Sequence, residues 1–324
     1  MKNLGWLFLA IFIAYSCAVV AALSRYRLRG RLGAFVGWCF VPIILLCPMV
    51  IPSANLTLRA ASAFLSGDIA FKIVDYFRHW GYVERPFVLR DYYRFLIPFP
   101  ALSTVYPDHK RRRSRPESPW PRLLRLFGGI VGCSIAVLTL KAISSNTLIR
   151  SSFALNHMVM LLSFVLAIES LSRAVCGLER LAGFDTSPII RNAYLSRTVS
   201  EFWRRYNYRV HDWLLRNVFQ PTGGRRSPIR SMMLVFIVSG LFHEVMFALA
   251  TSRLTGYQFA FFTIQAPAVL ASGHLERLAR TGGIAGKITA HGATILFMAT
   301  TSVLFFEGVG RIFPFIYACR SPLP

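Results

Sequence analysis

Apolar stretches of about 20 residues recur from one end of this chain to the other, and no other feature constrains its fold as strongly. An α-helix needs that length to cross a hydrocarbon core about 30 Å thick. The composition agrees, because 54% of the 324 residues are hydrophobic and 16% are charged, whereas soluble domains carry about 25% charged residues. The sequence therefore predicts an integral membrane protein, all-α in class, with residues 1–324 forming a single polytopic helical bundle.

The hydrophobic pattern predicts about eight transmembrane helices. The third is the least regular, because it contains Asp68, Lys72 and Asp75. It either spans the membrane facing a polar cavity or lies in the membrane interface. The predicted segments are 4–23, 33–51, 60–77, 123–143, 153–171, 231–250, 257–271 and 289–306.

The positive charge lies between the apolar stretches. The chain has 37 Lys and Arg against 14 Asp and Glu, a formal net charge of +23. Nucleic-acid binding would need a water-soluble basic face, so this class is excluded. Instead, the positive-inside rule places the basic segments 78–122 and 173–230 in the cytoplasm. This assignment favours a segment 60–77 that spans the membrane. If that segment lay in the interface instead, the basic residues near 110 would fall on the outer side of the membrane. It also predicts both termini outside, in a bacterial inner membrane or the endoplasmic reticulum.

No metal site is predicted. The six cysteines show neither CxxC nor Cys/His spacing of the zinc type. We expect them to pack as small hydrophobic side chains.

An ionisable residue, His243, interrupts the apolar segment 231–250. Such a residue is costly in a bilayer and usually faces a protein interior or a water-filled cavity. On a helix, Ser239, Gly240 and Phe247 share its side, which predicts room for a ligand next to the imidazole. A hydrogen bond that only ties two helices together is the structural alternative. A metal ligand is disfavoured because no second His stands at HxxxH spacing.

A basic, aromatic-rich segment, residues 200–221, leads directly into the helix that carries His243. If it is helical, Trp203, Asn207 and His211 share one face. We expect four arginines to point toward water, namely Arg204, Arg205, Arg209 and Arg216. An amphipathic helix that merely anchors the chain to anionic lipid is the alternative interpretation.

These residue types suit acyl transfer. A neutral histidine in a dry cavity can activate a hydroxyl group as a general base, and an acyl thioester is a natural electrophile. A cytoplasmic arginine cluster can hold the phosphates of a coenzyme A donor. An amide such as Asn207 can bind the thioester carbonyl as negative charge develops on its oxygen.

Three motifs resemble the membrane-bound O-acyltransferase superfamily, in its wax-synthase-like and sterol or diacylglycerol acyltransferase branches. Thr198 to Asn207 resembles the plant wax synthase pattern Ser-Leu-x-x-Phe-Trp-Gly-Arg-Arg-Trp-Asn, with Thr-Val in place of Ser-Leu, the glycine absent and Tyr206 in place of Trp. Asn207 to Pro221 follows the segment Trp-Asn-x-x-Val-His-x-Trp-Leu-x-Arg-x-Val-Tyr-x-Pro of the sterol and diacylglycerol enzymes from its Asn onward. Ser239 to Glu244 is similar to the Ser-Gly-x-x-His-Glu stretch that carries the catalytic histidine.

The resemblance implies an acyl-CoA-dependent O-acyltransferase whose helical bundle encloses a reaction chamber. In it, His243 is the base and Asn207 its partner. Acyl-CoA is a donor substrate rather than a permanent cofactor. The predicted acyl-CoA-binding residues are Trp203, Arg204, Arg205, Arg209, His211 and Arg216, and those lining the chamber are Ser239, Gly240 and Phe247.

The acceptor follows less directly from the motifs. A long-chain alcohol giving a wax ester is the first expectation, and diacylglycerol, a sterol or a polycyclic secondary metabolite are alternatives. The competing class is a non-catalytic membrane protein. It would be a transporter with His243 as a proton relay, or a lipid-binding scaffold docked through the basic segment.

Overall fold

The computed structural model describes residues 2–28, 31–79, 92, 96, 118–144, 146–184 and 186–314. Within these residues the regular secondary structure is helical, which confirms the all-α class. Most of the predicted basic loop 78–122 lies outside the described residues. The chain divides into two compact units, residues 1–111 with 242–255 and residues 112–241 with 256–324. The prediction that residues 1–324 form a single domain stays a prediction.

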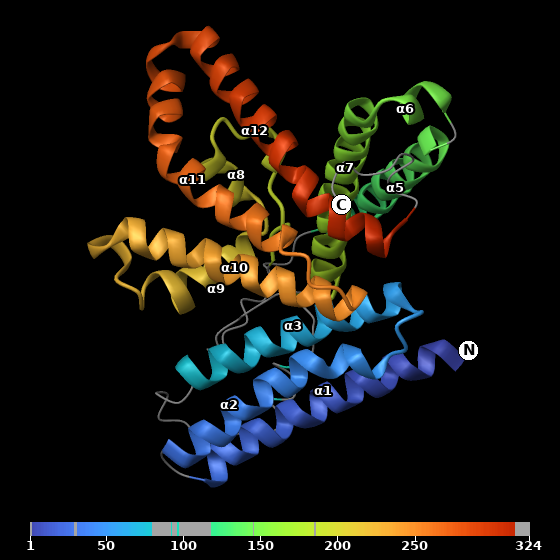
Figure 1. The fold of residues 1–324 in the computed structure, drawn as a ribbon, viewed down its shortest axis with the longest axis vertical. Coiled ribbons are helices and arrows are strands. Elements are labelled where there is room, and N and C mark those ends of the chain that lie inside the picture. The colour runs from blue at the N-terminus through green and yellow to red at the C-terminus, as the bar shows by residue number, and fades with distance from the viewer. Residues whose placement is uncertain are drawn as a thin grey trace. The chain divides into compact units, whose positions relative to one another are not determined.

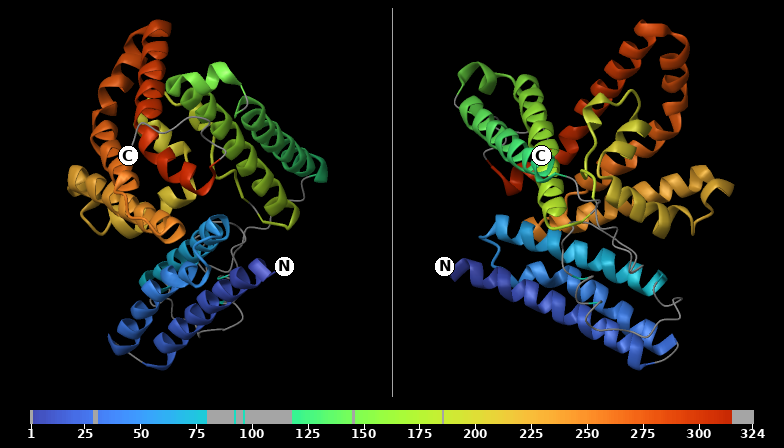
Figure 2. Two further views of the ribbon diagram at one scale, coloured as in Figure 1. Left: turned by 45° about the vertical axis from the view of Figure 1, so that its right-hand side comes forward. Right: turned by 180° about the vertical axis from the view of Figure 1, so that it is seen from behind.

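The first unit is built on three helices that lie side by side (Figures 1 and 2). They are α1 (Lys2–Arg27), α2 (Arg31–Leu46) and α3 (Leu56–His79), and the short 3-10 helix η1 (Cys47–Val50) extends α2. Pro42 lies inside α2 and Pro48 inside η1. The regular helix ends just before Pro48, because proline lacks the N–H that would continue the hydrogen-bond ladder.

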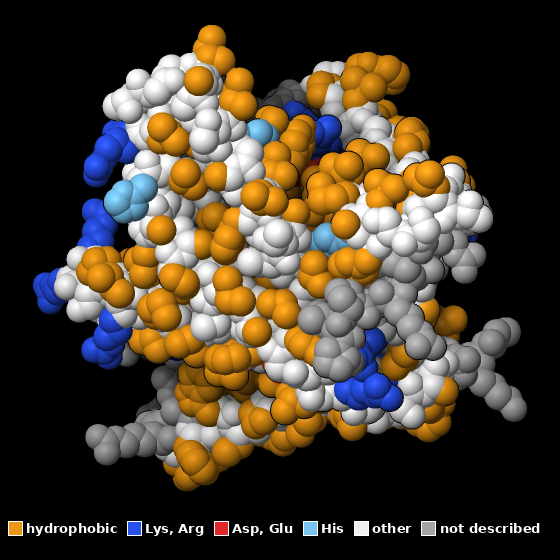
Figure 3. Space-filling view, turned by 45° about the horizontal axis from the view of Figure 1, so that its top comes forward, with side chains coloured by type: hydrophobic (Ala, Val, Ile, Leu, Met, Phe, Trp, Pro, Cys, Tyr) orange, Lys and Arg blue, Asp and Glu red, His pale blue; other side chains and the backbone are white. Residues whose placement is uncertain are grey.

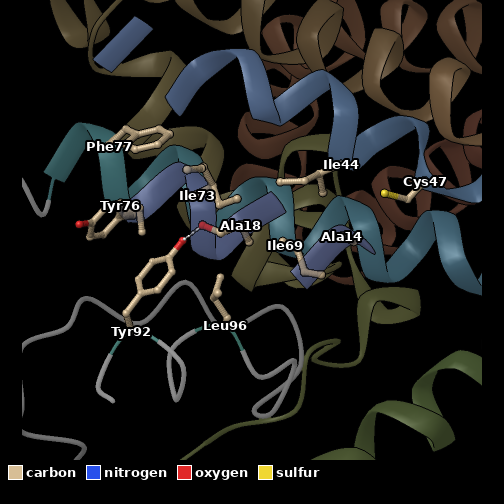
Figure 4. Close-up of a cluster of buried hydrophobic side chains, with 12 residues drawn as sticks. Ala14, Ala18, Ile44, Cys47, Ile69, Ile73, Tyr76, Phe77, Tyr92 and Leu96 are labelled. Atoms are coloured by element: carbon tan, nitrogen blue, oxygen red, sulfur yellow. Dashed lines mark hydrogen bonds between the residues drawn. The ribbon is translucent and has the colours of Figure 1, made fainter. Parts of the chain in front are cut away.

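Small side chains on α1 allow these helices to approach closely. Ala14 and Ala18 are fully buried and face Ile69 and Ile73 of α3, as Figure 4 shows. The hydroxyl of Tyr92 donates a hydrogen bond of 2.9 Å to the carbonyl oxygen of Ala18. Close packing of small residues is how helices associate when lipid offers no hydrophobic driving force.

The second unit contains two helical hairpins and the polar segment between them (Figure 1). One hairpin pairs α5 with α7 and the other pairs α11 with α12. The helix α10 begins in this unit and ends in the first. The helices are α5 (Pro119–Ser144), α6 (Thr147–Ser151), α7 (Phe153–Leu181), η3 (Ala193–Leu195), α8 (Val199–Arg205), α9 (Tyr208–Leu214), the π-helix η4 (Leu215–Phe219), η5 (Gly224–Arg226), α10 (Pro228–Thr251), α11 (Tyr257–Thr281) and α12 (Gly283–Ile312).

Glycines bring α5 and α7 into backbone contact. A Cβ atom at Gly129 would lie 2.5 Å from the backbone of Ser170 and Ala174, and one at Gly177 would lie 2.6 Å from the backbone of Leu126. Only residues without side chains fit there. The α5–α7 hairpin is therefore a fixed base for the polar segment that follows α7.

Helices occupy all eight predicted positions, and five are long and apolar enough to cross a membrane. These five segments are Leu4–Ser24, Pro119–Ile143, Phe153–Leu181, Pro228–Thr251 and Gly283–Ile312. The apolar stretch Phe35–Val50 is shorter. Neither α3 nor α11 is among the five, so the count of eight transmembrane helices stays a prediction.

Charged side chains explain the low hydropathy of α3. Asp68 and Lys72, one helical turn apart, form a buried ion pair with a separation of 3.2 Å. A buried charge is tolerated in a membrane helix when it is paired. The pair thus lets a helix with these charges pack on α1 and α2.

The surface matches a protein surrounded by lipid. Hydrophobic side chains are spread across the face in Figure 3, while many of the Lys and Arg side chains lie along its left edge. On α5, Trp120, Phe127 and Leu138 are each at least 60% exposed. Large apolar side chains exposed to this extent are expected where acyl chains replace water.

Candidate active site

The helix α10 holds His243 near the middle of an apolar run. His243 is partly buried and Ser239 is buried. Gly240 is a point of contact with α11, since a Cβ atom there would lie 3.1 Å from the carbonyl oxygen of Phe259 and 3.2 Å from Cβ of Phe262. The space that we expected Gly240 to leave for a ligand is thus filled by α11. Phe247, one turn beyond His243, is partly buried.

Glu244 fixes the end of the same helix. Its buried carboxylate accepts a hydrogen bond of 2.8 Å from the backbone N–H of Thr255, in the turn after α10. A carboxylate bonded in this way satisfies a backbone donor that would otherwise be unpaired. Glu244 therefore stabilises the turn next to the histidine helix.

The segment before α10 is not one continuous helix, so the prediction that Trp203, Asn207 and His211 share a helix face is wrong. Tyr206 is extended and Asn207 is left-handed, with φ 48° and ψ 58°. Asparagine tolerates this conformation better than most residues. The chain therefore turns between α8 and α9.

Asn207 caps the second of these helices. Its Oδ1 accepts a hydrogen bond of 3.3 Å from the backbone N–H of Val210. In the part of the chain that the structure describes, its side-chain NH₂ group donates no hydrogen bond. One half of the amide is thus structural, and the other half can donate to a ligand.

Trp203 anchors α8 to α11. Its indole N–H donates a hydrogen bond of 3.2 Å to Oε1 of Gln265, whose Nε2 donates in turn to Thr301 on α12. The ring packs against Phe236 of α10 and Phe262 of α11. Burying an aromatic ring with its polar atom paired is strongly stabilising. This places Trp203 in the helix-packing core.

Arg209 does not point toward water, so the prediction made for it is wrong. Its guanidinium group donates two hydrogen bonds to the Glu179 carboxylate, at 2.9 and 2.7 Å, and a third to the carbonyl oxygen of Ser187. Both charged side chains are at least 95% buried. Burial acts to lower the pKa of Arg209, but Glu179 outweighs it and holds that pKa above its ordinary value.

The remaining arginines differ in how free they are to bind a phosphate. Arg205 pairs with Glu201 at 2.5 Å and Arg216 pairs with Asp212. Arg204 is exposed and, among the described residues, has no ion-pair partner. Arg204 is therefore the most accessible of the four positive charges.

His211 lies beside this group on the exposed side of α9. Its pKa is below the ordinary value because neighbouring side chains partly withdraw the ring from water. Arg204 acts in the same direction and Asp212 in the opposite one. Near pH 7 the ring is mainly neutral, so His211 offers hydrogen bonds rather than charge.

Polar groups on α7 hold the loop that leads to α8, a role that the sequence did not predict. Glu169 accepts hydrogen bonds from the backbone N–H groups of Asn192 and Ala193, at 3.2 and 2.8 Å. Ser172 accepts one of 2.9 Å from the N–H of Ile190. The helix α7 continues ten residues beyond the predicted end at 171, to Leu181, and this extension carries Ser172 and Glu179, which bind the segment that follows. Two acidic residues next to a strongly basic segment were the available signal.

Removing the carboxylate of Glu179 is expected to destabilise the second unit. Glu179→Gln would leave the guanidinium of Arg209 buried without a counter-charge, which costs about 3–5 kcal/mol. We expect a large fall in the thermal unfolding temperature of the detergent-solubilised protein. The double variant Glu179→Leu/Arg209→Met should recover most of it, because an apolar pair of similar size replaces both charges.

The partly exposed pair Glu201 and Arg205 provides the control for this measurement. Glu201→Gln keeps an acceptor for the N–H of Arg197, and exposed ion pairs contribute at most about 1 kcal/mol. Equal losses of stability for Glu179→Gln and Glu201→Gln would contradict the role given to Glu179.

Among the described residues, no group of three or more His, Cys, Asp or Glu side chains could hold a metal ion. The candidate residues thus fall into two groups. His243 and the residues of α10 from 242 onward belong to the first unit, and Asn207 with the basic residues of α8, α9 and η4 belongs to the second.

A family model described as "MBOAT, membrane-bound O-acyltransferase family" matches residues 131–305, which is 175 of the 324 residues. The matched region contains both Asn207 and His243. It begins within α5 and ends within α12.

Individual relatives are similar at low identity. Diacylglycerol O-acyltransferase 1C of Glycine max is 29% identical over 112 residues, which cover 34% of this chain and 22% of that protein. Diacylglycerol O-acyltransferase 1A of the same plant is 24% identical over 294 residues, covering 76% of this chain and 59% of the relative. The chain therefore spans less than two thirds of the length of these relatives.

A relative with a different acceptor in its name aligns over more of its own length. The long-chain-alcohol O-fatty-acyltransferase of Simmondsia chinensis is 26% identical over 249 residues, covering 68% of this chain and 67% of that protein.

Proposed function

The chain belongs to the membrane-bound O-acyltransferase family, and from this premise we propose that it transfers an acyl group from acyl-CoA to the hydroxyl group of a hydrophobic acceptor. The observation that carries the proposal is the position of His243. It is a partly buried imidazole in an apolar helix of membrane-spanning length, inside the matched region. An ionisable residue in such a place is a functional-site candidate by default.

In the proposed reaction, His243 removes the proton of the acceptor hydroxyl as its oxygen attacks the thioester carbonyl carbon. The NH₂ group of Asn207 donates a hydrogen bond to the carbonyl oxygen as it becomes negative. The tetrahedral intermediate then collapses, the C–S bond breaks, and the CoA thiolate takes the proton back from His243. The products are an ester and free CoA, and the histidine returns to its neutral state.

The donor is proposed to enter from the cytoplasmic side. Arg204 supplies an accessible positive charge for the CoA phosphates, and His211 supplies hydrogen bonds. Arg205 and Arg216 contribute by exchanging their carboxylate partners for phosphate. Arg209 is not among the proposed donor contacts, since its buried, bidentate pair with Glu179 fixes its side chain. Trp203 acts indirectly, by fixing α8.

The acceptor is proposed to reach the reaction chamber through the bilayer. A long-chain alcohol is the first choice, and diacylglycerol is the second. Relatives whose names state each of these acceptors match the chain at similar identity. The buried Ser239 and the partly buried Phe247 flank His243 on α10 and are proposed to line the acceptor side.

Membranes from cells that express the protein, supplied with labelled acetyl-CoA or palmitoyl-CoA, test the proposal. The acceptors are a long-chain alcohol, diacylglycerol and a sterol, and membranes without the protein are the control. We expect labelled ester from at least one donor and acceptor pair. If folded protein gives no ester with any pair, the alternative of a transporter or lipid-binding scaffold is favoured.

A further inference from the structure

The helix α3 contacts α10 directly beside His243. A Cβ atom at Gly67 would lie 2.8 Å from Cζ of Phe242, closer than real side chains approach, and 3.4 Å from Sδ of Met246. Glycine at this position is therefore what allows the Phe242 ring to rest against the backbone of α3. Glycine inside a helix costs about 1 kcal/mol relative to alanine, so the close contact must offset that cost.

Two more contacts hold the helices in this register. The ring of Phe71, one turn along α3, stacks on the ring of Phe242 with centroids 4.6 Å apart. At the other end, the buried Arg59 donates a hydrogen bond of 2.6 Å to the hydroxyl of Ser252, just after α10. The helices are thus antiparallel, with contacts on either side of His243.

Phe242 is clamped between α3 and its own helix, and His243 is the next residue. Successive side chains on a helix are separated by a fixed rotation of about 100°. The ring of Phe242 also meets the imidazole edge to face, with centroids 5.9 Å apart. Any rotation of α10 that moved His243 would also break the contacts of Phe242 with Gly67 and Phe71.

We infer that α3 positions the proposed catalytic base, with Gly67 as the positioning residue and Phe242 as the side chain through which it acts. This inference rests on the proposed function of His243. It extends the support of the site to a helix outside the family match, which begins at residue 131. The helix α3 therefore has a role at the proposed site beyond anchoring the chain in the membrane.

A double-mutant cycle tests the inference. Gly67→Ala adds a Cβ atom that would lie too close to Cζ of Phe242, and Phe242→Leu removes that Cζ atom. Gly67→Ala is expected to lower kcat about 10- to 100-fold, as small displacements of catalytic groups do, with KM for acyl-CoA within about twofold of wild type. The double variant should regain activity relative to Gly67→Ala and match Phe242→Leu.

A matched glycine controls for the effect of alanine itself. A Cβ at Gly5 of α1 meets nothing within 4 Å, so Gly5→Ala should leave kcat and KM unchanged. Phe71→Leu removes the stacking ring without adding bulk. It should also lower kcat, so the inference can still be tested if Gly67→Ala fails to fold.

The outcomes separate this inference from the proposed function. Full activity of His243→Gln would overturn the proposed function, and the inference with it. If His243 is required, an unchanged kcat in Gly67→Ala overturns the inference alone. So does a loss that Phe242→Leu does not relieve, since the effect would not pass through Phe242.

Discussion

Replacing His243 by glutamine is expected to lower kcat for ester formation by about 10²- to 10⁴-fold, the range that a general base contributes. Glutamine keeps a polar side chain of similar size, so the fold of α10 should be retained. The KM for acyl-CoA should change little, because the proposed donor contacts lie on α8, α9 and η4. The measurement compares initial rates with the best donor and acceptor pair in membranes that contain equal amounts of protein.

A second histidine in the same unit as the proposed donor site supplies the control. His274 is exposed on α11, and His274→Gln should retain the wild-type rate. A His243→Gln protein that is folded and turns over at the wild-type rate would remove the catalytic role of His243. Loss of activity together with loss of acyl-CoA binding would point instead to a structural role.

A histidine that does serve packing shows what the alternative looks like. Nε2 of His157 on α7 lies 2.9 Å from the carbonyl oxygen of Ala299 and 3.2 Å from the hydroxyl of Ser302, both on α12. His157 is 5% exposed, and it ties two long apolar helices of the second unit together. His243 is more exposed than this, which fits a group that has to meet a substrate.

Hydropathy alone predicted where the long helices lie, because the length and composition of a membrane helix are set by the bilayer rather than by tertiary contacts. Helices were found at all eight positions, from α1 to α12. The end of α7 was misplaced, since Glu169, Ser172 and Glu179 bind the following segment from a helix that continues past the apolar run. The partners of those hydrogen bonds lie 18 to 30 positions away in the sequence, so hydropathy within the helix does not reveal them.

The polar segment before α10 was predicted least well, for two physical reasons. Residues 199–214 have a helical pattern throughout, and the extended backbone of Tyr206 and the left-handed backbone of Asn207 interrupt it. The arginines were all expected in water, because charge patterns indicate exposure on average. The burial of Arg209 depends on the single carboxylate of Glu179, 30 residues earlier in the chain.

The double role of Asn207 predicts that its structural and chemical contributions can be separated. Asn207→Asp keeps an acceptor for the N–H of Val210 and tolerates the left-handed backbone, but it loses the NH₂ donor. We expect stability close to wild type and a kcat about 10²- to 10³-fold lower, the cost of removing one donor to a developing oxyanion. Asn207→Gly keeps the backbone freedom and should lose activity similarly, which separates loss of the donor from the charge that aspartate adds. Rates and thermal unfolding of each variant are measured on the same preparations.

Asn192 is a matched control because it is also left-handed, with φ 52°, and its Oδ1 accepts a hydrogen bond from Arg173. Asn192→Asp should leave kcat near wild type.

Asn207→Ala should add a loss of stability of about 1–2 kcal/mol, because alanine neither caps α9 nor favours a positive φ. Wild-type turnover by a folded Asn207→Asp protein would show that the amide serves only to cap the helix. Activity that falls in strict proportion to folded protein across the series would lead to the same conclusion. The alternative outcome is that Asn207→Asp loses turnover, Asn192→Asp keeps it, and both variants remain as stable as wild type. That result would place the Asn207 donor at the reacting carbonyl.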